Sequence, residues 1–130
     1  AVEQLQIENK SVQILVLAPT RELATQITSE ARKLTRNIHQ ATSLSVVGGE
    51  ANGREQSQAL RKGVHLVAGT PGRVLDHLQR NQLNLDHLKM FIIDEADKFF
   101  EIGFAEDLSE ILTFIDPQVQ TALFSATFPE

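Results

Sequence analysis

The sequence predicts an α/β domain built on a parallel sheet of about five strands with helices on both faces. Two observations lead to this prediction. Short apolar segments alternate along the chain with longer amphipathic segments, which is the order of a repeated strand–helix unit. Most of the short segments are also apolar throughout, as expected for strands that are covered on both faces of a sheet.

Each short apolar segment is expected to form one strand, because it is bounded by proline, glycine or polar residues. The expected strands are residues 13–18, 44–47, 64–68, 90–93 and 121–124.

Helices are expected between these strands. The first begins after Thr20, which is a favourable N-cap residue, and a polar helix is expected over residues 52–62. Thr70 and Pro71 form the N-cap and the first residue of a third helix. A fourth helix is expected over residues 104–115. The residues expected to pack in the core around this last helix are Phe99, Phe100, Phe104, Ile111, Leu112 and Phe114.

The composition is that of a single globular domain. Of the 130 residues, 42% are hydrophobic and 22% are charged, which is too apolar for a disordered chain. No segment approaches the run of about 18 to 20 apolar residues that a membrane helix needs, and no signal-peptide pattern is present. The chain has no cysteine, so disulfides and thiolate metal sites are excluded. Its net charge of −5 argues against a wholly basic nucleic-acid surface but leaves room for binding through a few local arginines and backbone amides. An intracellular protein, cytoplasmic or nuclear, is expected.

The polar clusters of this sequence follow the expected strands. In a parallel α/β sheet the ligand site lies beyond the carboxyl ends of the strands. The sequence therefore predicts one site at this edge of the sheet. The clusters, in chain order, are residues 19–21, 48–49, 70–73, 94–97 and 125–127.

The segment FIIDEAD, residues 91–97, brings three carboxylates together where an apolar strand ends. Carboxylates this close repel one another unless a cation, a hydrogen-bond donor or water compensates them. Apolar residues followed by Asp94 and Glu95 match a Walker B pattern, in which the Asp holds hydrated Mg²⁺ and the Glu lies beside the water that attacks a nucleoside triphosphate. The alternative is a helix N-terminus, where acids are favoured by the helix dipole alone.

A phosphate-binding P-loop would be expected beside such a pattern, but none is found. Gly48 and Gly53 have P-loop spacing, yet Arg54 and Glu55 follow where Lys and a hydroxyl residue are required. The helix starts at residues 19–21 and 70–73 each offer spare amides, a hydroxyl and one arginine. Together they favour a phosphate-binding track, and the alternative is two capped helices with solvated arginines.

These clusters, in this order, resemble the first RecA-like domain of the DEAD-box RNA helicases, and the resemblance covers essentially the whole chain. The matching motifs are APTRELA at residues 18–24, GG at 48–49, TPGR at 70–73, DEAD at 94–97 and SAT at 125–127.

The resemblance implies an ATP-dependent RNA helicase that uses ATP and Mg²⁺. Asp94 would serve Mg²⁺ through water and Glu95 would serve the hydrolytic water, while Asp97, Ser125 and Thr127 would couple the ATP state to domain closure and strand separation. The residues implied to hold the sugar-phosphate backbone of RNA are Pro19, Thr20, Arg21, Gly49, Thr70, Pro71, Gly72 and Arg73.

The resemblance also implies that the 130 residues are part of a longer protein. The family's glutamine motif and its Walker A strand and loop precede APTRELA, and a second RecA-like domain follows SAT. Residues 1–130 would thus be a partial N-terminal helicase domain, inactive as an ATPase on its own. Without the Walker A strand, the strand at residues 121–124 would have an unpaired side that could cause self-association.

Two other function classes stay open. The chain could be a stand-alone module that binds RNA or a partner protein without hydrolysis, and would then bind RNA equally with and without nucleotide. It could also be a receiver-like or other Mg²⁺-dependent α/β protein that uses an Asp at a strand end. Receivers usually offer a Lys after the last strand, where this chain has Ser125-Ala126-Thr127.

Overall fold

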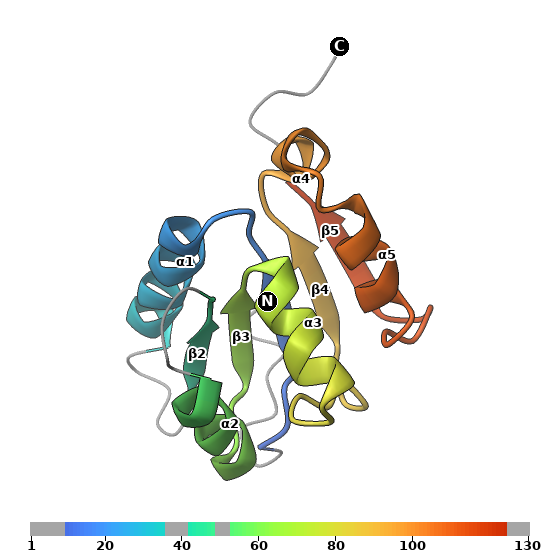
Figure 1. Ribbon diagram of the computed structural model, residues 1–130. Helices are drawn as coiled ribbons and strands as arrows, with labels where there is room; N and C mark the ends of the chain where they lie inside the picture. Colours follow the sequence, from blue (N-terminus) through green and yellow to red (C-terminus); the bar gives the residue numbers. More distant parts are fainter. Residues whose placement is uncertain (1–9, 36–41, 49–52, 125–130) are drawn as a thin grey trace.

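The computed structural model describes residues 10–35, 42–48 and 53–124, which form a five-stranded parallel sheet flanked by helices (Figure 1). Strands and helices alternate, as predicted, except that two helices precede the last strand. The elements in chain order are β1 (Ile14–Leu17), α1 (Arg21–Leu34), β2 (Ser43–Val46), α2 (Gly53–Lys62), β3 (Leu66–Gly69), α3 (Pro71–Gln79), β4 (Met90–Ile93), α4 (Ala96–Ile102), α5 (Ala105–Leu112) and β5 (Gln120–Leu123).

The order of the strands in the sheet is β2-β3-β1-β4-β5, so β1 lies at the centre. The register aligns the carboxyl ends of all five strands. Leu17, the last residue of β1, is paired with Gly69 of β3 on one side and with Ile93 of β4 on the other. Val46 of β2 and Leu123 of β5 continue the same row. The segments that follow the strands therefore leave from one edge, as the sequence predicts.

The two faces of the sheet are covered unequally. Alternate residues of the strands, such as Leu15 and Phe91, belong to the larger core cluster, which also contains residues of α3 and α5. The other face, including Ile14 and Val16, packs mainly against Ala31 and Ile27 of α1. Helices on both faces are thus confirmed, and α1 covers one face with little help from the other helices that are described.

The prediction for the segment between β4 and β5 was wrong in two respects. The structure has two helices there: α5 forms the expected helix within residues 104–115, and α4 before it was not predicted. Leu112 and Phe114 were expected in the core but are 46% and 42% exposed. α5 ends at Leu112, and the Phe114 amide donates to the Ile111 carbonyl at 3.0 Å in the turn that follows. This turn leaves the Phe114 side chain at the margin of the core, where it lines a surface hollow. Phe99 and Ile111 are buried, as predicted.

Both predicted helix starts are confirmed. Thr20 is the N-cap of α1, and its hydroxyl accepts a hydrogen bond from the Leu23 amide at 3.2 Å. Thr70 is the N-cap of α3 with Pro71 at the first turn, although its hydroxyl makes no bond to the helix amides. In the part of the chain that is described, no helix has both the length and the apolar character needed to cross a membrane.

Candidate functional site

The candidate site lies along the carboxyl edge of the sheet, and the strand order decides which motifs are neighbours. Residue 48 follows β2, the Thr70 segment follows β3, and the Thr20 segment follows the central strand β1. The acidic segment follows β4. The edge therefore has two halves: the glycine, hydroxyl and arginine segments lie on the β2-β3-β1 side, and the carboxylates lie on the β4-β5 side.

Asp94 and Glu95 are held at the end of β4 by backbone hydrogen bonds. The Asp94 amide donates to the Leu17 carbonyl at 2.9 Å, which ties it to the end of β1. The Asp94 carboxylate accepts the Glu95 amide through Oδ1 at 2.9 Å. Glu95 pairs with Lys98, whose Nζ lies 3.3 Å from Oε1. Backbone donors and a lysine thus compensate part of this negative charge within the chain itself.

Glu95 has an unusual backbone. Its φ of 52° and ψ of 50° lie in the left-handed region, which costs a non-glycine residue about 1 kcal/mol or more. Strained residues of this kind concentrate at functional sites, where the strain aims a side chain. The tetrad DEAD gives no sign of this conformation, so sequence reasoning did not find it.

The acidic half of the edge suits a metal ion that takes most of its ligands from a nucleotide and from water. Within the described residues, no three His, Cys, Asp or Glu side chains come close enough to form a metal site by themselves. Mg²⁺ at nucleotide sites needs fewer protein ligands, because one or two carboxylates share the ion with phosphates and waters. Asp94 is only half-buried, and its Oδ2 has no hydrogen-bond partner among the described residues, so its carboxylate fits that role.

Asp97 lies in the first turn of α4 and is half-buried. The start of this helix is hydrogen-bonded to the residue that follows β5, since the Ala96 amide donates to the Phe124 carbonyl at 2.9 Å. Phe124 directly precedes Ser125. The other two predicted coupling residues, Ser125 and Thr127, lie outside the described residues.

In the other half of the edge, the Thr20 segment contacts the segment after β2. Pro19 is buried beneath the turn that leads into α1, and the exposed Arg21 donates from Nη1 to the Gly48 carbonyl over a long 3.5 Å. Gly49, also predicted to contact RNA, lies outside the described residues. The structure thus places Arg21 beside the glycine segment that the sequence assigned to the same site.

The Thr70 segment lies between the two others. The Thr70 amide donates to the Val46 carbonyl at 3.1 Å, and Pro71 is buried. Gly72 is exposed, and a Cβ added to it would meet no atom within 4 Å. This opening lies at the first turn of α3, where unpaired amides and the positive end of the helix dipole favour a phosphate oxygen.

Arg73 is half-buried and has buried partners that the sequence did not reveal. Its Nη1 donates to Oε1 of Gln56 at 3.1 Å, and the same oxygen lies 2.9 Å from Nε2 of His77. Gln56 and His77 are 4% and 2% exposed. No spacing rule connects a glutamine of α2 with two residues of α3, so only the structure could show this contact.

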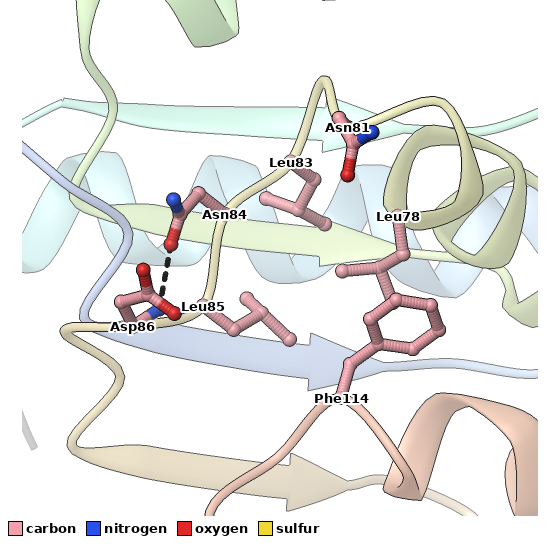
Figure 2. Close-up of a pocket in the computed structure, with 7 residues that line it drawn as sticks. All are labelled: Leu78, Asn81, Leu83, Asn84, Leu85, Asp86 and Phe114. Atoms are coloured by element: carbon pink, nitrogen blue, oxygen red, sulfur yellow. Dashed lines mark hydrogen bonds between the residues drawn. The ribbon is translucent and has the colours of Figure 1, made fainter.

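The hollow drawn in Figure 2 lies at the opposite edge of the sheet, on connections that lead into the amino ends of β4 and β5. It measures about 270 Å³, and Figure 2 shows Phe114 lying against Leu78 on one side of it. Asn84 accepts the Asp86 amide at 2.7 Å and closes a local turn. This hollow contains none of the motif residues and is separate from the candidate site.

Comparison with known proteins agrees with the fold and with the family that the sequence resembles. The family model described as DEAD/DEAH box helicase matches residues 1–130, and the chain belongs to this family.

Relatives of known name are similar over nearly the whole chain. The chain is 43% identical over 129 residues to the DEAD-box ATP-dependent RNA helicase CshA of Geobacillus kaustophilus, covering 99% of this chain and 27% of that protein. It is 44% identical over 129 residues to the ATP-dependent RNA helicase DeaD of Escherichia coli K12, covering 99% of this chain and 20% of that protein.

A crystal structure of a DEAD box protein from the hyperthermophile Methanococcus jannaschii superposes with a TM-score of 0.90 at 40% identity, covering 98% of this chain and 34% of that one. The RecA-like α/β fold is therefore confirmed. The 130 residues span between a fifth and about a third of the length of these three proteins.

Proposed function

We propose that residues 1–130 are part of the first RecA-like domain of an ATP-dependent RNA helicase, which couples ATP binding and hydrolysis to the binding and local unwinding of RNA. The observation that carries this proposal is the division of one sheet edge into an acidic half at β4 and an arginine- and glycine-containing half at β2, β3 and β1. The similar proteins CshA and DeaD are named as ATP-dependent RNA helicases, which supports it.

In the acidic half, Asp94 would hold Mg²⁺ through water and Glu95 would orient the attacking water. Bound Mg²⁺ would supply charge neutralisation on the phosphates. Catalysis of phosphoryl transfer depends mostly on positioning and charge. The left-handed backbone of Glu95 and its pairing with Lys98 at 3.3 Å support a fixed direction for this carboxylate.

Asp97, Ser125 and Thr127 would form the link between the ATP state and the RNA. The support is the hydrogen bond between the Ala96 amide and the Phe124 carbonyl, which joins the start of the Asp97 helix to the residue before Ser125. A change at the carboxylates would thereby reach the end of β5 directly.

In the other half, RNA would be held through its backbone and not through its bases. Arg21 and Arg73 supply charge, and the helix starts at Thr20 and Thr70 supply dipoles and unpaired amides. The open space beside Gly72 lets a sugar-phosphate chain approach closely. Contacts of this kind position a strand without reading its sequence. Gly49, Pro19 and Pro71 would belong to the same track, the two buried prolines through the helix starts that they shape.

The 130 residues alone are expected to hydrolyse ATP negligibly, because no Walker A pattern occurs in them and the second RecA-like domain would supply the rest of the cleft. The alternative function is a stand-alone RNA- or protein-binding module. It differs in one respect that can be measured: its affinity for RNA would be the same with and without a nucleotide.

The test uses a full-length helicase that carries these residues. Glu95→Gln should leave ATP binding near normal and lower RNA-stimulated turnover by at least about a hundredfold, since general-base catalysis contributes about that much. Glu106→Gln, at an exposed position of α5, is the matched control and should keep the parental rate. An unchanged rate for Glu95→Gln would refute the role of Glu95, and nucleotide-independent RNA binding would favour the binding module.

A further inference from the structure

Gln56 is a buried amide whose two ends have different partners. It lies in α2, and its Nε2 donates to the Val47 carbonyl at 3.1 Å. Its Oε1 faces Arg73 Nη1 at 3.1 Å and His77 Nε2 at 2.9 Å. The opposite orientation of the amide would place an NH₂ group against the arginine and an oxygen against a carbonyl. The partners therefore fix the orientation of Gln56.

The same contact determines the protonation of His77. An amide oxygen can only accept, so the hydrogen must lie on His77 Nε2. His77 Nδ1 is then the bare nitrogen, and it is buried with no hydrogen-bond partner among the described residues. A second proton would leave a charged N–H unsatisfied there, which is costly in a buried position. His77 is therefore a neutral imidazole with one defined tautomer.

The net effect of the surroundings is to lower the pKa of His77, which also favours the neutral imidazole. Burial lowers it, the Asp76 carboxylate opposes this, and the guanidinium groups of Arg73 and Arg80 lower it further. Across a hollow of about 300 Å³ that His77 lines, α2 contributes two more arginines, Arg54 and Arg61. The imidazole thus faces mainly cations.

We infer that Gln56 and His77 are positioning residues for Arg73: the neutral imidazole holds the Gln56 amide, and the amide holds the guanidinium of Arg73 at the RNA-facing edge. The inference rests on the proposed contact between Arg73 and phosphate. Arg73 donates one of its five N–H groups to Gln56, and the remaining donors make no hydrogen bond within the described residues. The guanidinium is thereby fixed in direction and still able to bind an anion.

Gln56 and His77, which together form the brace for Arg73, also connect it to the segment after β2. A Cβ added to Gly53 would lie 3.4 Å from Arg73 Nη1, and one added to Gly48 would lie 4.0 Å from Nη2. Gln56 holds the same segment through the Val47 carbonyl. Replacing Gln56 should therefore release Arg73 from the β2 end of the sheet without removing its charge.

The experiment measures the affinity of a full-length helicase for single-stranded RNA, with a double-mutant cycle between Gln56→Leu and Arg73→Ala. Gln56→Leu should weaken binding about fivefold, the scale of one hydrogen bond, and should have no further effect in the Arg73→Ala background. His77→Leu should reproduce this loss, and His77→Gln, whose amide can donate from about the same position, should restore most of the affinity. Thermal unfolding of each variant shows that the domain is folded.

The outcomes separate the brace from the proposed function. If Arg73→Ala itself leaves RNA affinity unchanged, the phosphate track is wrong and the inference falls with it. If Arg73→Ala weakens binding, two results refute the brace alone. In one, Gln56→Leu causes the same further loss of affinity in the Arg73→Ala background as in the parent; in the other, Gln56→Leu does not weaken binding at all. Long-range ¹H–¹⁵N correlation spectra of the imidazole give a readout besides binding: the Nε2–H tautomer is expected, and the Nδ1–H tautomer would overturn the inference.

Discussion

Gly69→Ala adds one methyl group at the point where the neighbouring strands β2 and β3 end, and it should destabilise the domain. Gly69 is the last residue of β3 and is buried. Its new Cβ would lie 2.5 Å from the Val46 carbonyl oxygen and 2.6 Å from Val74 Cγ2. The Val46 carbonyl is backbone that already accepts the Thr70 amide at 3.1 Å, so it cannot move without straining the β2–β3 pairing.

The expected cost is about 3 kcal/mol of unfolding free energy, the upper part of the range for an added methyl group in a packed core. Gly72→Ala is the matched control, made three residues further along the chain. No atom lies within 4 Å of a Cβ there, and the residue is helical, so this variant should gain about 0.5 to 1 kcal/mol. The same substitution is thus expected to have opposite effects at two nearby glycines.

The assay is urea denaturation followed by circular dichroism, together with RNA affinity. Gly72→Ala should be more stable than the parent and yet bind RNA more weakly, because its methyl group occupies the space proposed for the phosphate chain. A neutral effect of Gly69→Ala would show that the carboxyl ends of β2 and β3 are looser than the register indicates. Undiminished RNA binding by Gly72→Ala would contradict the close approach of RNA at α3.

Three further results are expected. Arg73→Ala should weaken binding about equally for two unrelated RNA sequences and reduce the salt slope by roughly 0.7, whereas loss confined to one sequence would indicate base readout. Because the pKa of His77 is lowered on folding, the stability contributed by its neutral form is complete above the ordinary value of about 6.5 and is lost as the pH falls below it. The unfolding free energy, measured at several pH values, should therefore fall less steeply below pH 6.5 for His77→Gln than for the parent. The isolated 130 residues should self-associate through β5, because its last residue Leu123 and the following Phe124 are 58% and 53% exposed. A sedimentation profile of a monomer at high concentration would contradict this.

Much of the fold was predictable because its signals are local. Strand positions follow from apolar runs of four to six residues, and β4 was predicted at the same residues that the structure shows. The caps at Thr20 and Thr70 depend on a residue and its next few neighbours, so they too were predictable. The acidic half of the site was predictable for the same reason, because its carboxylates lie within four consecutive residues, 94–97.

The end of α5 and the backbone of Glu95 could not be predicted, since both depend on packing with distant segments. An apolar pattern continues through Phe114, but the chain must turn toward β5 and leaves that side chain 42% exposed. Glu95 adopts its left-handed conformation where β4 passes into α4, between the hydrogen bonds that fix Asp94 to β1 and Ala96 to the end of β5.

What the sequence determined by itself is the set of motifs and the expectation that they share one edge, because parallel strands place their carboxyl ends together. What only the tertiary structure decided is their order along that edge and the contacts between them. The strand order β2-β3-β1-β4-β5 separates the arginine segments from the carboxylates, and α2 brings Gln56 against Arg73 and His77. Both depend on how crossover helices pack on the sheet, which is a long-range free-energy balance that no local pattern encodes.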